Sequence, residues 1–324
     1  MSADHSSPRR FANRHLPDRA PQGVLRWQLQ RLRDRLPRPP RAPITGVVPD
    51  VAWLQANRTV TSLTWIGHSS LLYQRDGVNV LFDPVFSAFA SPVQFAGPRR
   101  HQPPGLALAE LPHVDVVLLS HAHYDHLDLP SVRALARQPG GSPTFLVPLG
   151  LDSWFARHVR GARVRACAWD DVVSWPGRTT TLELHFLAVQ HWSNRTPWDR
   201  NRTLWGSWAI VDPGFRFWFS GDLGYSRDTQ EIGARFGRFD LAAIAIGAYE
   251  PRWFMRDQHL NPDEAVRVMG EVGAERAIGI HWGTFALTDE SLDEPPRALA
   301  AAVAAHGLAS DRFDVMRHGE TRRY

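Results

Sequence analysis

The segment 120–128, SHAHYDHLD, gathers several side chains that could bind a metal ion, directly after the apolar run 114–119, VDVVLL. Within six residues it holds His121, His123, Asp125 and His126. Imidazole nitrogen and carboxylate oxygen are ligands that zinc prefers in proteins. A buried strand that ends here can hold these side chains rigidly over the end of a sheet. The segment indicates a metal site, provided that other parts of the chain supply further ligands.

Three other apolar runs end in a residue of the same kind. The run FLAVQH ends in His191, FWFSGD ends in Asp222 and AIGIH ends in His281. Together with the four residues of the opening segment, these make seven candidate ligands. Seven exceed what one catalytic zinc ion needs, and they suit two ions that share a carboxylate.

The spacing within the opening segment favours the same division. In extended backbone, residues i and i+2 point the same way, so His121 and His123 can share one metal. A turn at Tyr124 would swing Asp125 and His126 toward a second metal. One histidine at a strand end would more often be a hydrogen-bonded core residue, but chance is a poor explanation for the whole set.

The composition limits the classes of protein to which this chain can belong. The chain has 324 residues, 43% of them hydrophobic, which is enough for a large core. No apolar stretch approaches ~20 residues, so a membrane span is not expected. The single cysteine, Cys167, leaves no internal disulfide and no cysteine-based zinc cluster, and a cytoplasmic location is the default expectation.

The positive charge lies in residues 1–43, which hold ten arginines against three acids, while the remaining residues are nearly neutral. A neutral body argues against nucleic-acid binding. We expect residues 1–43 to form a basic tail, with disorder over 1–22, an amphipathic helix over 24–36 and a stiff proline-rich linker over 37–43. Leucines at 25, 29, 32 and 36 form one stripe, by which the helix could lie on anionic lipid or dock on the body.

Residues 44–324 are expected to form one domain that carries the candidate ligands. The two runs around Arg75-Asp76-Gly77 predict a β-hairpin, and six further runs at 114–120, 179–189, 205–211, 215–220, 241–246 and 276–280 predict strands. A helix is expected from Asn261, which can cap it, with Pro262 in the first turn. Strands mixed with helices, with polar residues at strand ends, indicate a layered α/β fold.

The motif HxHxDH, followed by a histidine, an aspartate and a histidine, resembles the metallo-β-lactamase superfamily. Longer stretches, among them HAHYDHLD, QHWSNRTPWDRNRTLWGSWAI, GAYEPRWFM and IHWGTFALTDE, resemble the N-acylphosphatidylethanolamine-hydrolysing phospholipase D family. The likeness runs from about Val47 to His318. It implies an αββα sandwich, two zinc ions, a phospholipid substrate at a membrane surface and a homodimer.

By motif position, the resemblance implies that one zinc ion is held by His121, His123 and His191, the other by Asp125, His126 and His281, with Asp222 bridging both. The implied reaction converts N-acylphosphatidylethanolamine to phosphatidic acid and N-acylethanolamine. A hydroxide between the zinc ions would be the nucleophile, oriented by Asp222. The family's matching tyrosine and histidine contact the N-acylethanolamine part of the lipid, which favours substrate roles for Tyr124 and His259. His259, or solvent, would protonate the leaving oxygen.

Other residues near the ligands have simpler expected roles. His68 and Asp83 would hold ligand histidines in place. Trp192 and Trp198 lie in the least strand-like part of a tryptophan-rich stretch, so we expect them to line an apolar groove for lipid. Two alternatives stay open: another hydrolase of the same fold, such as a sugar-phosphate lactonase, or a scaffold without turnover.

Overall fold

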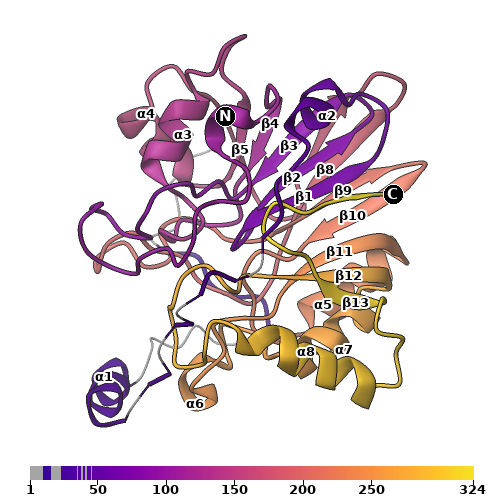
Figure 1. Cartoon of the computed structure of the whole chain (residues 1–324). Coiled ribbons are helices and arrows are strands. Elements are labelled where there is room, and N and C mark those ends of the chain that lie inside the picture. The colour runs from indigo at the N-terminus through magenta and orange to yellow at the C-terminus, as the bar shows by residue number, and fades with distance from the viewer. Residues whose placement is uncertain (1–9, 16–22, 35, 38, 41, 45) are drawn as a thin grey trace, which may run out of the picture.

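The computed structural model describes residues 10–15, 23–34, 36–37, 39–40, 42–44 and 46–324. Two seven-stranded sheets lie face to face, with helices on their outer faces (Figure 1). This four-layered αββα arrangement confirms the fold that the sequence predicted. In the described part of the chain, no helix combines the length and apolarity needed to cross a bilayer.

The first sheet has the order β14-β1-β2-β3-β4-β5-β6. The hairpin between β2 and β3 is the predicted one, and its turn residues Asp76 and Gly77 both have positive φ, at 49° and 80°. From β3 to β6 the strands are parallel. The bounds of the strands are β1 Ser62–Gly67, β2 Ser70–Arg75, β3 Val78–Phe82, β4 Val116–Leu118, β5 Thr144–Pro148, β6 Arg163–Cys167 and β14 Thr321–Arg323.

The second sheet has the order β13-β12-β11-β10-β9-β8-β7. Strands β10 to β13 are parallel, and β8 runs in the same direction because it is antiparallel to β9, which is antiparallel to β10. The bounds are β7 Val172–Pro176, β8 Thr181–Leu187, β9 Ser207–Asp212, β10 Phe215–Phe219, β11 Phe239–Ala245, β12 Ala274–Ile280 and β13 Phe313–Val315.

The core between the sheets follows from alternation along the strands. In β2, Leu71 and Tyr73 face the other sheet, and Leu72 faces the helices outside. Tyr73 stacks on Phe217 of β10 with ring centroids 5.0 Å apart, which joins the two sheets. Because both faces of the central strands are buried, these strands read as nearly continuous apolar runs in the sequence.

Helices cover the two outer faces. Apolar residues of α2 (Val51–Ala56), α3 (Leu129–Leu135) and α4 (Leu151–His158) join the cluster outside the first sheet. Helices α5 (Asp228–Phe236), α7 (Pro262–Glu271) and α8 (Glu294–Ala305) lie on the second sheet (Figure 1). Asn261 caps α7 as predicted, since its side chain accepts from the backbone N–H of Glu264. The short α6 (Arg252–Met255) and the 3₁₀ turn Leu108–Glu110 lie in loops.

The N-terminal segment differs in part from the expectation. Residues 1–9 and 16–22 lie outside the described residues, but the prediction of disorder is wrong for residues 10–15. The N–H of Phe11 donates to Asn201 O at 2.7 Å, and Phe11 packs against the core. Asn13 Oδ1 accepts the backbone N–H of His191 at 3.1 Å. Residues 10–15 are ordered because Asn13 provides an acceptor for the buried backbone N–H of the candidate ligand His191.

The predicted basic helix is present as α1 (Val24–Arg33). It ends three residues earlier than expected, because Asp34 has extended backbone, and Arg35 lies outside the described residues. The alternative in which the leucines dock the helix on the body is wrong. Leu25, Leu29 and Leu32 are exposed, and Trp27 makes the contact with the body instead.

The ion pair between Arg75 and Asp212 links the two sheets and provides a test of the packing. Arg75 of β2 donates from Nε and Nη2 to Asp212 of β9 at 2.8 and 2.7 Å, and Asp212 is buried. We expect Arg75→Met to lower the free energy of unfolding by about 2–3 kcal/mol, because it leaves a buried carboxylate without its cation. Arg297→Met is the control, since Arg297 pairs with Asp293 on the exposed surface of α8. Equal losses in urea unfolding would contradict the expectation.

Candidate metal centre

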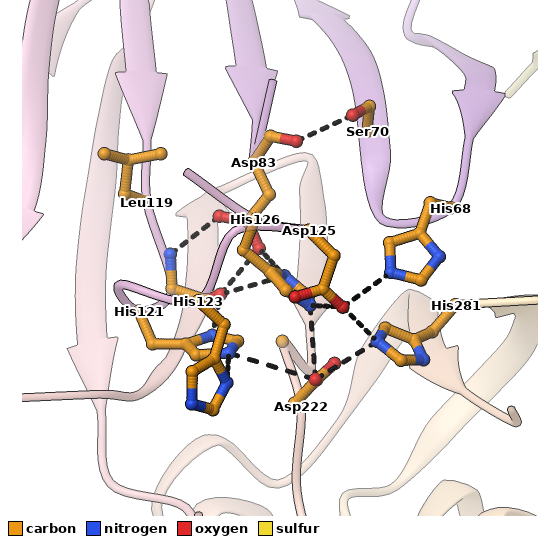
Figure 2. A network of polar contacts seen from close by, with 12 residues as sticks. His68, Ser70, Asp83, Leu119, His121, His123, Asp125, His126, Asp222 and His281 are labelled. Atoms are coloured by element: carbon orange, nitrogen blue, oxygen red, sulfur yellow. Dashed lines mark hydrogen bonds and ion pairs between the residues drawn. The ribbon is translucent and has the colours of Figure 1, made fainter. Parts of the chain in front are cut away.

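The seven candidate ligands follow strands whose carboxyl ends meet at one edge of the sandwich. The segment 121–126 follows β4, His191 follows β8, Asp222 follows β10 and His281 follows β12. Strands β8, β10 and β12 run the same way, so their ends deliver side chains to one place. Figure 2 shows the ligands from β4, β10 and β12 turned toward a common centre.

A first group consists of His121, His123 and His191. Each offers one nitrogen, and these atoms all lie within 4.8 Å of one another. His121 Nε2 lies 2.8 Å from His123 Nδ1. His121 and His191 are buried, and His123 is partly exposed at the rim. Three imidazoles with no carboxylate among them suit one zinc-like ion with a position left for water.

A second group consists of Asp125, His126 and His281. Asp125 Oδ2 lies 3.5 Å from His126 Nε2 and 3.3 Å from His281 Nε2. The two histidine rings lie nearly parallel, with centroids 5.2 Å apart and an interplanar angle of 19°. His68 completes the surroundings, with Nε2 at 3.0 Å from the same Asp125 oxygen.

Asp222 lies between the two groups. Its Oδ2 is 3.2 Å from His126 Nε2 and 3.1 Å from His281 Nε2 on one side. On the other side it is 3.9 Å from both His121 Nε2 and His191 Nε2. A single carboxylate oxygen within reach of both groups is the arrangement that a bridging ligand requires.

The chemistry of these atoms fits bound metal. Four buried atoms find no hydrogen-bond partner of suitable geometry among the described residues: His126 Nε2, His191 Nε2, His281 Nε2 and Asp222 Oδ1. Buried polar atoms without a partner are costly, and four that converge on one place indicate a cation that the protein binds there.

Electrostatics within the cluster supports the same interpretation. Burial alone would raise the pKa of Asp222, yet the neighbouring His126 and His281 hold it well below its usual range. Burial would lower the pKa of His126, but the carboxylates of Asp222 and Asp125 outweigh it and raise that pKa. In the first group, burial and the neighbouring imidazoles lower the pKa of His121 well below its usual value. The neutral form, which is the form that binds metal, is therefore favoured at His121.

A surrounding layer of hydrogen bonds orients the ligands. Asp83, buried after β3, accepts from His126 Nδ1 at 2.7 Å and from the N–H of Ser120 at 2.7 Å. His191 Nδ1 lies 2.9 Å from Gln258 O. These bonds fix which ring nitrogen turns toward the centre, as outer partners of metal-binding histidines usually do. Asp83 thus holds a ligand histidine as expected, whereas the polar contact of His68 is to the candidate ligand Asp125 and not to a histidine.

The backbone at the site adopts uncommon conformations. His68, Asp83 and His281 have positive φ values of 53°, 37° and 63°. Such residues persist where the surroundings over-determine them, and they cluster at functional sites. Gly221, directly before Asp222, has φ 58°, and a Cβ there would lie 2.8 Å from Ser120 Cβ and 2.9 Å from Gly206 O. Only glycine fits at the strand end that delivers Asp222.

His259 lies next to the ligands, in the loop before α7. Its Nδ1 is buried, 3.9 Å from Asp222 Oδ2, and has no hydrogen-bond partner in the part of the chain that the structure describes. Its ring centroid is 5.3 Å from that of His191. Burial lowers the pKa of His259 to about 4, so the ring is neutral at pH 7. A neutral imidazole beside the centre can donate or accept one hydrogen bond with a substrate.

Tyr124 and Trp192 border the first group, whereas Trp198 does not. The Tyr124 hydroxyl donates to Arg195 O at 2.9 Å, so it is engaged with the protein. Trp192 lies edge-on to His123, with centroids 4.5 Å apart. Trp198 is 76% exposed in a turn and touches none of the candidate ligands by an aromatic contact. Of the two tryptophans predicted to line a groove, the structure brings only Trp192 to the centre.

The sequence analysis did not identify Arg195, whose hydrogen bonds hold the loop of residues 121–127 in place. Its Nη1 donates to Ala122 O and Leu127 O, both at 2.8 Å, on either side of the ligands His123, Asp125 and His126. The guanidinium lies over the rings of Tyr124 and Trp154, at 4.1 and 4.7 Å from their centroids. Burial lowers its pKa to about 10, which keeps it charged at pH 7. The long irregular stretch after His191 was the only signal that pointed to it.

Comparison with known proteins agrees with this geometry. The family model described as "Beta-lactamase superfamily domain" matches residues 78–282, a range that includes every candidate ligand. N-acyl-phosphatidylethanolamine-hydrolyzing phospholipase D 1 of Caenorhabditis elegans is 42% identical over 72% of this chain and 67% of its own length. The mitochondrial N-acyl-phosphatidylethanolamine-hydrolyzing phospholipase D of Saccharomyces cerevisiae is 33% identical over 80% of this chain and 55% of its own length.

The chain belongs to the N-acylphosphatidylethanolamine-hydrolysing phospholipase D family of the metallo-β-lactamase superfamily. Among solved structures, a metallo hydrolase of the archaeon Ignicoccus hospitalis shares the fold, with a TM-score of 0.60 at 19% identity over 82% of this chain and 99% of that one. Like other members of this family, the protein is a metal-dependent hydrolase with histidine and aspartate groups able to bind metal.

The role of Asp83 can be tested by metal retention. Asp83→Asn keeps the shape of the side chain but removes the charge that faces His126, so we expect metal affinity to fall roughly 10- to 100-fold while the fold is retained. Asp76→Asn is the control, because Asp76 accepts the N–H groups of Thr179 and Thr180 in a distant hairpin contact. Elemental analysis after dialysis against a chelator gives the comparison. Retention as in the unaltered protein would show that Asp83 does not support the ligands.

Proposed function

We propose that the protein hydrolyses N-acylphosphatidylethanolamine to phosphatidic acid and N-acylethanolamine, using two zinc ions per chain. The observation that carries the proposal is the position of Asp222 Oδ2, within 3.9 Å of a nitrogen from each of two histidine groups. The names of the worm and yeast relatives support the choice of substrate.

The proposed division of the ligands between the two ions follows the sequence prediction. His121, His123 and His191 would hold one ion, Asp125, His126 and His281 the other, and Asp222 both. Two such ions supply an activated water and neutralise the charge on phosphate oxygens. Zinc is preferred for imidazole and carboxylate ligands, although manganese and iron suit similar sites.

The chain's own groups would orient the lipid. His259 is proposed to donate a hydrogen bond to the leaving ethanolamine oxygen, with water supplying the proton. Tyr124 would contact the lipid by its ring or by releasing its hydroxyl from the Arg195 carbonyl. Trp192 would line the path of an acyl chain beside His123, and the exposed Trp198 would contact lipid at the surface.

The substrate is a bilayer lipid, so the proposal includes peripheral association with a membrane surface. A cytoplasmic location and a homodimer stay predictions. A sugar-phosphate lactonase and a scaffold without turnover are the competing functions, and the position of the cleaved bond separates all three.

The cleaved bond can be located with heavy-oxygen water. Hydrolysis joins a water oxygen to phosphorus and breaks the bond between phosphorus and the ethanolamine oxygen, which gains a proton. We expect one labelled oxygen in phosphatidic acid and none in N-acylethanolamine, as measured by mass spectrometry of the products from mixed micelles. Label in a carboxylate would indicate a lactonase or esterase. Release of diacylglycerol would indicate cleavage of the other phosphate ester bond.

His259 is tested by a variant that leaves the predicted ligands unchanged. We expect His259→Ala to lower kcat/KM on the order of 100-fold, because the leaving oxygen loses a positioned hydrogen-bond donor, with metal content unchanged. His306→Ala is the control, because His306 pairs with Asp263 on the surface, 2.9 Å apart. Loss of metal in His259→Ala would instead make His259 a ligand, since its nitrogen lies within 4.8 Å of ligand atoms of Asp222 and His281.

A further inference from the structure

Helix α1 is fastened to the body by one side only. The Trp27 ring stacks on Phe254 of α6 with centroids 4.8 Å apart, and Trp27 Nε1 donates to Asp289 at 2.9 Å. Arg31 Nε pairs with the same aspartate at 3.2 Å. Arg26 lies over the ring of Trp253, 4.6 Å from its centroid. In Figure 1, α1 and α6 lie at the same end of the molecule.

The opposite side of α1 is an apolar stripe that faces solvent. Leu25, Leu29 and Leu32 are 74%, 58% and 84% exposed, and their spacing puts them on one face of the helix. We name this stripe the leucine face. A contiguous apolar face of this kind, next to charged residues, marks a surface that binds another apolar body.

The charge around the leucine face favours an anionic bilayer as that body. Helix α1 contains no acidic residue and carries Arg26, Arg31 and Arg33, of which Arg31 pairs with Asp289 and Arg33 with Asp34. In the sequence, the segment 1–43 that contains α1 holds ten arginines against three acids. An apolar stripe flanked by arginines is the pattern of helices that lie in the interface of anionic membranes. Two copies of α1 paired through their leucines would bring these positive charges together.

The residues that fasten α1 belong to the loops that support the metal centre. The Asp289 N–H donates to Glu250 O at 3.1 Å, and Met255 O accepts the N–H of His259 at 2.9 Å. In the same loop, Gln258 O lies 2.9 Å from His191 Nδ1. A bilayer that binds the leucine face would therefore lie near the loops that position His259 and His191.

We infer that the leucine face of α1 contacts the surface of an anionic bilayer and holds the metal centre beside it. This inference rests on the proposed function in one respect, because a bilayer substrate is what makes such a surface useful. Binding itself is independent of substrate, so it can be measured on vesicles that the enzyme does not hydrolyse.

The test is sedimentation of the full chain with vesicles of phosphatidylcholine and phosphatidylglycerol in equal parts. Leu25→Gln/Leu29→Gln/Leu32→Gln removes the apolar stripe while keeping residues of similar helix propensity. We expect it to weaken vesicle binding at least about tenfold, and binding of the unaltered protein to weaken as salt rises. Val48→Gln is the control, because Val48 is an apolar residue outside the helix that is 95% exposed. Vesicle binding of this variant should match that of the unaltered protein.

Three results would overturn the inference. The first is equal binding of the leucine variant and the unaltered protein. The second is equal binding to vesicles of phosphatidylcholine alone, which would remove the role of negative charge. The third is a dimer that the leucine variant dissociates in analytical ultracentrifugation, which would assign the face to a second copy of the chain. Circular dichroism and metal content of the variant separate each result from a folding defect, and none of these readouts depends on which lipid is cleaved.

Discussion

The metal centre depends on one buried carboxylate at the end of β10. Asp222 Oδ2 lies between 3.1 and 3.9 Å from nitrogens of four histidines that come from three separate loops. A buried carboxylate is costly unless it faces cations or hydrogen-bond donors. On one side, the carboxylates of Asp222 and Asp125 outweigh burial and raise the pKa of His126, and on the other side burial lowers the pKa of His121. Metal ions held by the two groups would neutralise the Asp222 carboxylate, because its Oδ2 lies within reach of nitrogens from both groups.

The architecture of the sandwich explains how loops far apart in the chain meet at Asp222. Strands β4, β8, β10 and β12 end at one edge, so the ligands need only short loops to reach the centre. The loops themselves are held by contacts to backbone. Arg195 binds both ends of the 121–126 loop, Asn13 binds the N–H of His191, and Gln258 orients its ring. Rigid support of this kind keeps ligands in place without relying on the metal.

Much of this arrangement could be predicted from local sequence. Apolar runs that end in His, Asp or Gly-Asp located the strands of the core and the residues that converge there, because burial on both faces leaves a continuous apolar signal. The sequence analysis did not predict the edge strands β6 and β7. Their residues alternate between exposed and more buried positions, so they form no continuous apolar run. The roles of Asn13 and Arg195 also could not be predicted, since each acts on backbone atoms of a segment more than 60 residues away.

The orientation of α1 shows why amphipathic periodicity alone is ambiguous. A leucine stripe normally predicts the buried side of a helix. In α1 the contacts of Trp27, and not the leucine stripe, decide which side faces the body. One tryptophan can stack on Phe254 and donate to Asp289 at the same time. The leucines are left in solvent, beside arginines that the body only partly neutralises. A helix that buries its aromatic residue and exposes its aliphatic ones makes sense when a second apolar surface, outside the protein, completes the burial.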